Sequence, residues 1–488
     1  MLRTCGQLRL SEYDGLYDLI VDKNHLLRKI KDHIDFSFVN PMLRESYCER
    51  FGRPAKEPEM MFKLEFLKKI YDLSDEALIR DVKVNMAFKY FLGMNPEDEP
   101  VDSSLLTKFR RTRITEDILG DMLSETVRQA MEKGLIKSRM IIVDATHSKT
   151  GARQETPTQI LRRLTKELRR EIYRTQFELS GKFPEKPLET ADLNEEIEYS
   201  KKLVGAVRPE VDGAGSGKSK KTLSKITALL ESDGLAEIQS LADRDARGGH
   251  KSEDNRFFGY KTHVAMTEDR IITGLEVTTG EACDGKQMGK IVEQSRANGI
   301  EVEEVCGDTA YSSKGNMEYA RENGIKLISR LHPIVSNGAG TAAKGFEFNK
   351  DADTFRCPAG HLSVRKAQKG RRNVGRNHVV AYYFDVEKCS VCPLREECYR
   401  DGAKSRTYNV TILSETHREQ KEFQETPYFR ERARQRYMIE AKNAEMKQAH
   451  GLGKADSRGL AAMRLQSYFT AFVVNVKRIV RLAEPRTA

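Results

Sequence analysis

Apolar residues recur with helical spacing through the first 135 residues of the chain. The segment EPEMMFKLEFLKKIYDL places five of them on one i, i+3, i+4 face: Met60, Met61, Leu64, Leu67 and Ile70. The segment LSDEALIRDVKVNMAFKYFLGM starts at Ser74, a typical helix N-cap, and ends at Gly93, a typical helix stop. We therefore predict a helical N-terminal domain over residues 1–135.

The region from 151 to 249 carries two further amphipathic helical patterns, which are rich in charged residues. TPTQILRRLTKELRREIYRTQFEL and ETADLNEEIEYSKKLVGAV predict a helical hairpin inserted into another domain. DGAGSGKSKK, which follows, is similar to a phosphate-binding loop, but Asp212 stands where that loop needs glycine and no strand precedes it. We interpret this segment as a flexible basic linker.

Strand patterns appear at Met140–Val143 and again after residue 250. FFGYKTHVAMTEDRIITGLEVTTG predicts a hairpin around TEDR. Two later strands, EVEEVCGDTAYSS and KLISRL, alternate with the helices GKQMGKIVEQSRANGI and GNMEYARENGI. The order β, helical insertion, β, β, α, β, α, β is that of an RNase H-like fold, so we predict an α/β protein with a mixed five-stranded sheet.

The C-terminal part predicts two long helices. PYFRERARQRYMIEAKNAEMKQAHGL forms one, and the strongly apolar GLAAMRLQSYFTAFVVNVKRIVRLA forms a second that belongs in a core or an interface. Residues 339–409 hold clustered cysteines and short strand patterns, which indicates a second insertion. The predicted catalytic domain then comprises three segments: 136–150, 250–338 and 410–488.

Two aspartates follow predicted strands that are neighbours in such a sheet. Asp144 ends the first strand and Asp308 ends the fourth. Either could serve as a turn or helix-cap residue, but adjacent carboxylates repel each other unless a cation is bound. Hard oxygen ligands suit Mg²⁺, and two such ions roughly 3.5–4 Å apart can promote phosphodiester chemistry. We therefore predict a divalent-metal site at Asp144 and Asp308.

A third acid is expected from a helix that packs on this edge. Arg436, Glu440 and Lys447 share one helix face at spacings of four and seven, and Arg432 extends that face by a turn. Glu440 would bind metal while the flanking cations bind phosphate; the alternative is a surface helix with salt bridges. Two other acids of this helix remain candidates: Glu431 and Glu445.

Four cysteines lie close together in FRCPAGH and EKCSVCPLREEC: Cys357, Cys389, Cys392 and Cys398. The Cys-x2-Cys spacing and the Cys-Pro-x-Gly pattern predict a structural Zn²⁺ site, since disulfides are disfavoured in a reducing cytosol. His361 could replace one thiol, although a solvent-facing histidine is the simpler interpretation.

The charge balance favours a polyanionic partner. The net charge is +10, hydrophobic residues make up 39% of the chain and charged residues 32%. Within DSSLLTKFRRTRI we predict that Lys108, Arg110 and Arg111 bind DNA, with a solvated basic face as the alternative. No apolar run is long enough to cross a bilayer and the N-terminus lacks a secretory pattern, so we expect a cytoplasmic protein.

These motifs together resemble those of bacterial insertion-sequence transposases of the DDE class. The family's first aspartate, with threonine two residues later, matches Asp144 and Thr146 in VDATH. Its second aspartate, with tyrosine three residues later, matches Asp308 and Tyr311 in GDTAY. The N-terminal segments FVNPMLRESYCERFGRPAKEPEMMFKL and DSSLLTKFRR are also similar to the helical N-terminal domain of these enzymes.

The helix signature of the same family places Arg, Glu and Lys at the spacings found here for Arg436, Glu440 and Lys447. A tyrosine normally stands three residues before that arginine, where this chain has Ala433. Related transposases often carry an insertion between the last strand and the glutamate helix, which corresponds to the cysteine-rich region.

The resemblance implies a transposase that cleaves DNA at transposon ends and transfers the freed strand to a target. It implies two Mg²⁺ or Mn²⁺ ions at the three acids, DNA as partner, a homodimer or higher oligomer on DNA, and a location at the bacterial nucleoid. Two alternatives remain open from the residues: a metal-dependent nuclease of the same fold without strand transfer, and a zinc-containing DNA-binding regulator whose acids are structural.

Overall fold

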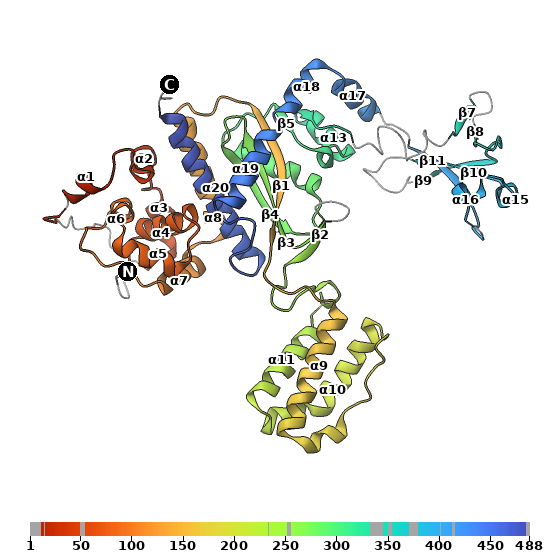
Figure 1. Ribbon diagram of the computed structural model, residues 1–488, viewed down its shortest axis with the longest axis horizontal. Coiled ribbons are helices and arrows are strands. Elements are labelled where there is room, and N and C mark those ends of the chain that lie inside the picture. Colours follow the sequence, from red (N-terminus) through yellow and green to blue (C-terminus); the bar gives the residue numbers. More distant parts are fainter. Residues whose placement is uncertain are drawn as a thin grey trace.

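We describe the protein from a computed structural model. Its described residues are 11–13, 15–48, 54–232, 234–250, 255–331, 345–349, 354–369, 379–400, 402–411 and 415–484. A central sheet lies between a group of N-terminal helices on one side and a small β-rich unit on the other, and a helical bundle projects below it (Figure 1). The expected boundary at residues 338 and 339 lies outside the described residues.

The N-terminal region is helical, as predicted. Ser74 accepts a hydrogen bond from the Ala77 amide at 3.1 Å and caps its helix, and Gly93 ends the following helix with a φ of 71°. The elements are α1 Leu16–Ile20, α2 Leu26–His33, α3 Val39–Leu43, η1 Arg44–Ser46, α4 Pro58–Ile70, α5 Asp75–Val84, α6 Met86–Leu92, α7 Ser104–Arg113 and α8 Glu116–Glu132.

The central sheet is mixed, and its order follows the predicted succession of strands. Its strands are β1 Met140–Lys149, β2 Arg247–His250, β3 Arg256–Thr267, β4 Ile272–Thr279, β5 Glu304–Cys306 and β6 Lys326–Ile328. β1 pairs antiparallel with β3 and parallel with β5, β5 pairs parallel with β6, and β4 pairs with β3. The short β2 also pairs with β3, which makes a sixth strand that the sequence pattern did not indicate.

Two helices connect the parallel strands: α12 Met288–Ala297 and α13 Lys314–Glu322. The predicted α/β class and mixed sheet are therefore confirmed. β2 was missed because Gly248 and Gly249 interrupt any alternation of apolar and polar residues. Gly249 is required there, since a Cβ would lie 2.2 Å from the carbonyl oxygen of Gly280.

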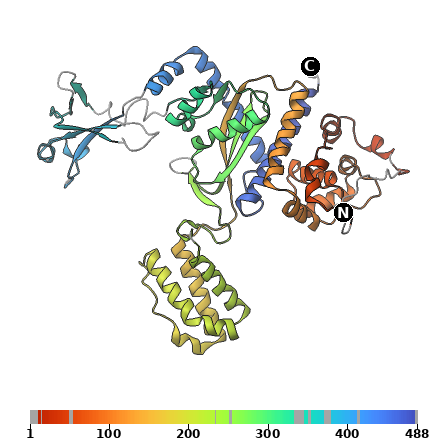
Figure 2. The same cartoon turned by 180° about the vertical axis from the view of Figure 1, so that it is seen from behind.

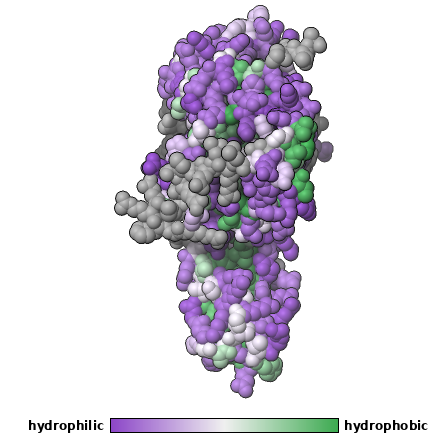
Figure 3. Space-filling view, turned by 90° about the vertical axis from the view of Figure 1, so that its left-hand side faces the viewer, coloured by the Kyte–Doolittle hydropathy of each residue, from purple (hydrophilic) through white to green (hydrophobic). Residues whose placement is uncertain are grey.

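The first insertion is a three-helix bundle with its own apolar core. Its elements are α9 Pro157–Thr175, η2 Phe177–Lys182, α10 Leu193–Ala214, α11 Gly217–Leu230 and η3 Leu235–Glu237. The flexible linker predicted at 212–221 is wrong, because Ser216 accepts a hydrogen bond from the Ser219 amide at 3.1 Å and starts α11. Seen from the side of the N-terminal helices, the bundle forms a mostly hydrophilic lobe below the body (Figure 3).

The cysteine-rich insertion contains two small sheets. Its elements are β7 Glu347–Asn349, β8 Thr354–Arg356, β9 Arg365–Lys369, β10 Val379–Phe384, α15 Val386–Ser390, α16 Arg395–Cys398 and β11 Arg406–Thr411. β10 pairs with both β9 and β11. Among the described residues of this unit, the buried apolar cluster consists of four aromatic residues: Phe346, Tyr382, Phe384 and Tyr408.

The C-terminal region has four helices, α17 Glu415–Gln424, α18 Pro427–Arg434, α19 Tyr437–Gln448 and α20 Leu460–Ala483. The prediction of a single helix across the first part of this region is wrong, because the helix is interrupted between the end of α18 at Arg434 and the start of α19 at Tyr437. Arg432 therefore does not extend the face of Glu440. Its guanidinium instead donates to Glu304 at 2.6 Å and to Glu268 at 2.9 Å, and these bonds fasten α18 to the sheet.

Helix α20 joins the N-terminal helices to the sheet. It contacts α8, α4 and α2 as well as β4, and its buried Phe469, Phe472 and Val476 belong to one apolar cluster with residues of both regions. Figure 2 shows α8 and α20 standing side by side between the sheet and the N-terminal helices. Among the described residues, no helix is both long and apolar enough to span a membrane.

Candidate active site

The two predicted aspartates lie at the same edge of the sheet. Ile142 of β1 is the register partner of Cys306 of β5, and each aspartate stands two residues further along the chain. β5 ends at Cys306, but β1 continues to Lys149 because its second half still pairs with β3. The prediction that Asp144 ends its strand is therefore wrong, and the carboxylate lies within β1 beside the open end of β5.

Asp144 is held in a desolvated, electronegative position. Burial raises the pKa of its carboxyl to about 6, and the nearby carboxylates of Asp308 and Asp284 act in the same direction. The Ala145 amide and the Arg436 guanidinium oppose this rise only partly. Clustered carboxylates in a site of low polarity favour a bound divalent cation, which removes their mutual repulsion.

Asp308 is fixed by the turn that follows β5. Its Oδ1 accepts from the Ala310 amide at 2.9 Å and caps η5, Thr309–Tyr311, while the Ser329 hydroxyl donates to its carbonyl oxygen at 2.5 Å. Tyr311 is fully buried, and its hydroxyl has no hydrogen-bond partner among the described residues. Burial, with the charges of Asp144, Asp284 and Asp308, raises the pKa of Tyr311 well above its usual value.

Asp284 is a further acid at this edge that the sequence analysis did not predict. It lies in η4, Asp284–Gln287, and its carboxylate accepts from Lys261 Nζ at 2.8 Å. The neighbouring Gly285 packs against η5 so closely that a Cβ would lie 2.3 Å from the Ala310 carbonyl oxygen. The only sequence signal for Asp284 is an Asp-Gly pair before a helix, and such pairs are common in turns.

Glu440 lies on α19 but is not joined to the two aspartates. Its side chain is 54% exposed and forms an ion pair with Arg436 at 2.7 Å. Within the described ranges, no three His, Cys, Asp or Glu side chains are grouped so that they could hold a metal ion. The structure thus brings Asp144 and Asp308 together and leaves Glu440 paired with arginine at the start of α19.

The two rival acids occupy other positions. Glu445 binds Lys477 at 2.8 Å and Lys442 at 3.0 Å; burial opposes ionisation, but these two lysines lower its pKa to about 2. Glu431 belongs to α18 and is exposed. Glu445 therefore has a structural role in holding α19 to α20, and Glu431 lies on a different helix from Arg436 and Lys447.

Basic side chains gather beside Asp308. A groove there is lined by Asp308 together with four arginines: Arg330, Arg430, Arg434 and Arg436. On the other side of the site, Lys447 Nζ lies 3.5 Å from His147 Nδ1. Thr146, which the motif singled out, is buried within β1.

The basic residues predicted in α7 differ in their placement. Lys108 and Arg111 are exposed, whereas Arg110 donates to Glu65 at 2.7 Å and also binds Asp75. Burial acts to raise the pKa of Asp75, but Arg110 and Lys68 outweigh it and lower this pKa to about 2. Arg110 thus holds α7 against α4 and α5, while Lys108 and Arg111 face solvent.

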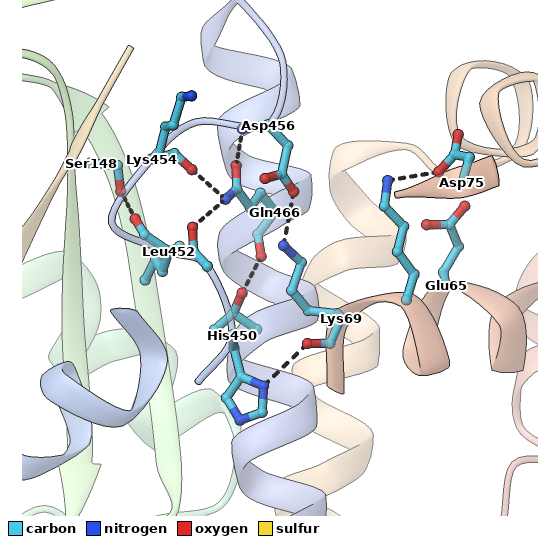
Figure 4. A network of polar contacts seen from close by, with 12 residues as sticks. Glu65, Lys69, Asp75, Ser148, His450, Leu452, Lys454, Asp456 and Gln466 are labelled. Carbon is cyan, nitrogen blue, oxygen red and sulfur yellow. Dashed lines mark hydrogen bonds and ion pairs between the residues drawn. The ribbon is translucent and has the colours of Figure 1, made fainter. Parts of the chain in front are cut away.

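A polar network connects the N-terminal helices to the segment after α19 (Figure 4). Lys69 Nζ of α4 binds the Asp456 carboxylate at 2.8 Å, and the carbonyl oxygen of Lys69 lies 3.1 Å from His450 Nδ1. The Ser148 hydroxyl of β1 donates to the Leu452 carbonyl oxygen at 2.5 Å. The end of α19 is therefore fixed both to the strand that carries Asp144 and to α4.

The four cysteines of the second insertion are free thiols that line one pocket. Burial raises the pKa of Cys389, and the other three thiols contribute to the same rise. The Arg406 guanidinium donates to Cys398 Sγ at 3.1 and 3.2 Å, and the His361 amide donates to Cys357 Sγ at 3.4 Å. The His361 side chain is exposed at the pocket rim.

Comparison with known families gives two matches along the chain. Residues 16–112 match a family described as transposase domain (DUF772), and residues 356–480 match a family described as transposase DDE domain. An N-terminal and a C-terminal part of the chain thus each match a transposase family, which supports an insertion-sequence DDE transposase. The predicted resemblance is thereby confirmed. The DDE match includes Glu440 but neither Asp144 nor Asp308.

The chain is also similar to an uncharacterized protein, ORF8 in the nfe locus of Rhizobium meliloti. The two are 33% identical over 85 residues, which is 17% of this chain and 41% of that protein. The chain therefore spans less than half the length of this relative.

Proposed function

We propose that this transposase cleaves DNA at the ends of a mobile element and joins the freed 3′ ends to target DNA, on an RNase H-like catalytic sheet. The strand order β4-β3-β1-β5-β6, with the last three parallel, supports that fold. The observation that carries the proposal is the desolvated Asp144 carboxylate beside Asp308 at the open end of β5.

The residues at this edge would supply oxygen ligands to a pair of divalent cations, once Glu440 turns toward the two aspartates. Asp144 and Asp308 supply the hard oxygen ligands, and two buried polar atoms nearby, Asn443 Oδ1 and Tyr311 Oη, have no partner among the described residues. When bound, Mg²⁺ or Mn²⁺ would activate the attacking oxygen and stabilise the leaving oxygen of a phosphodiester. Glu440, one helix turn before Asn443, is the third proposed ligand.

Glu440 must exchange its ion pair with Arg436 to take this role. The released Arg436 guanidinium would then bind a phosphate in the groove that it lines beside Asp308. Lys447 would bind the backbone on the opposite side of Glu440, and Lys108 and Arg111 would contact DNA through α7. These contacts make affinity steeply dependent on salt. We further propose action as a homodimer or higher oligomer, at the nucleoid of a bacterial cytoplasm.

For the cysteine-rich insertion we propose a structural Zn²⁺ ion bound by Cys357, Cys389, Cys392 and Cys398. Four free thiols line one pocket, and soft thiolate ligands are those that Zn²⁺ prefers in structural sites. The buried apolar cluster in the described part of the unit has four aromatic residues, so a bound ion would supply much of the folding energy.

The test uses a supercoiled plasmid that carries the DNA flanking the gene, incubated with purified protein and Mg²⁺ or Mn²⁺. Cleavage at discrete ends followed by joined products supports the proposal. Metal-dependent nicking that never yields joined products would identify a nuclease without strand transfer. Specific binding without any cleavage would identify a zinc-containing DNA-binding regulator.

A further inference from the structure

Asn443 lies between the glutamate helix and the strand that carries Asp144. It is only 8% exposed, and its Nδ2 donates a hydrogen bond to Asp144 Oδ2 at 2.8 Å. Its Oδ1 is buried and has no hydrogen-bond partner among the described residues. Asn443 thus joins α19 to the catalytic edge through a hydrogen bond to an acid.

The position of Asn443 is determined by elements on both sides. It follows Glu440 by three residues and precedes Lys447 by four, so all three share one face of α19. Beyond the helix, the bond from Ser148 to the Leu452 carbonyl oxygen ties the same segment to β1, four residues after Asp144. This arrangement leaves the amide little freedom to move away from the carboxylate.

Two unpartnered atoms near one carboxylate indicate a missing ligand. A buried polar atom without a partner costs about 1–3 kcal/mol, and such atoms are often satisfied by water or an ion. Asn443 Oδ1 can only accept a hydrogen bond, whereas Tyr311 Oη, which lies among Asp144, Asp284 and Asp308, can donate one. Water molecules around a cation at Asp144 would satisfy both atoms.

We propose that Asn443 is a positioning residue of the cation site. Its Nδ2 holds one oxygen of Asp144 and leaves the other for the cation, while its Oδ1 accepts a hydrogen bond from water bound at the site. Hydrogen bonds from neighbouring side chains orient carboxylate ligands, and their loss typically weakens metal affinity 10–100-fold. This inference rests on the proposed function, because it needs a cation at Asp144.

The test measures Mn²⁺ affinity of the purified full-length protein without DNA, by electron paramagnetic resonance titration. Asn443→Leu keeps the branching of the side chain but removes both hydrogen-bonding groups, and the smaller Asn443→Ser serves if the leucine variant fails to fold. We expect 10–100-fold weaker Mn²⁺ binding in either variant. Gln448→Leu, a similar change at an exposed position of the same helix, should bind Mn²⁺ as the unmodified protein does.

Asp144→Asn separates the two proposals. If the unmodified protein binds Mn²⁺ and Asp144→Asn does not, the cation site stands; unchanged affinity in both Asn443 variants would then overturn only the role of Asn443. If the unmodified protein binds no Mn²⁺, or Asp144→Asn binds it equally well, the proposed site fails and the inference fails with it. Melting temperatures in EDTA identify variants that are folded.

Discussion

Replacing Asp144 with asparagine should stabilise the metal-free protein at neutral pH, although it removes a proposed catalytic group. The pKa of this carboxyl is 3.8 in an ordinary environment and about 6 in the folded protein. At a pH between these two pKa values, the folded state therefore keeps a proton that the unfolded chain has lost. The free energy of unfolding then falls as the pH rises through this window, and the loss is complete above the folded-state pKa.

The size of the effect follows from that difference. Each pKa unit corresponds to about 1.36 kcal/mol, so the ionised carboxylate costs the folded state about 3 kcal/mol at pH 7.5. Asparagine has nearly the same shape and can still accept the hydrogen bond from Asn443, but it carries no charge. Asp144→Asn should thus raise the free energy of unfolding by up to about 3 kcal/mol at pH 7.5 and by almost nothing near pH 3.5.

The assay is urea denaturation in EDTA at both pH values, followed by circular dichroism because the chain contains no tryptophan. Asp121→Asn, a change of an exposed aspartate on α8, is the matched control and should give no such gain. Mg²⁺ at 100 times its dissociation constant should stabilise the unmodified protein by about 2.7 kcal/mol and leave Asp144→Asn unaffected. Equal gains at both pH values, or none at either, would refute the electrostatic reasoning.

Three further results are expected. Glu440→Gln should abolish DNA cleavage while leaving DNA binding largely intact. Glu445→Gln should lower the melting temperature, because it removes an ion-pair partner of two lysines. If Glu440→Gln still cleaves DNA and Glu445→Gln does not, the two acids exchange their roles. Arg436→Ala and Lys447→Ala should each weaken DNA binding and reduce the slope of log affinity against log salt by about one; unchanged slopes with lower melting temperatures would indicate salt bridges instead. Elemental analysis should find one Zn²⁺ per chain, and strong chelation should produce new proteolytic cuts in the cysteine-rich insertion first; less than about half an equivalent of zinc would count against the site.

Periodic patterns allowed much of the fold to be predicted, because burial of an apolar face depends on local spacing. The mixed sheet, its crossover helices and the N-terminal helices all follow such patterns. The break between α18 and α19 could not be predicted this way, since no proline or glycine marks it. Arg432 is instead bound by Glu268 and Glu304, two residues more than 100 positions earlier in the chain.

The candidate site was predictable only where a residue's role depends on its place in one element. Asp144 and Asp308 were found because each stands directly after the apolar run of a predicted strand, and the two strands are neighbours in the sheet. Asn443 and Asp284 were missed because their roles depend on contacts between α19 and β1 and between η4 and η5. The flexible-linker prediction failed because a single serine, Ser216, provides the cap that lets α11 begin directly after α10.

The position of α20 in the core has a consequence for biosynthesis. The N-terminal helices bury their apolar side chains against a helix that begins roughly 400 residues later, so they cannot complete their core while the chain is still being translated. At about 5–20 residues per second, this delay lasts on the order of 20–80 s. During that interval α2, α4 and α8 expose apolar surface to the cell. A nascent chain should therefore depend on chaperones, and a chain truncated before α20 should be degraded rather than compete for DNA.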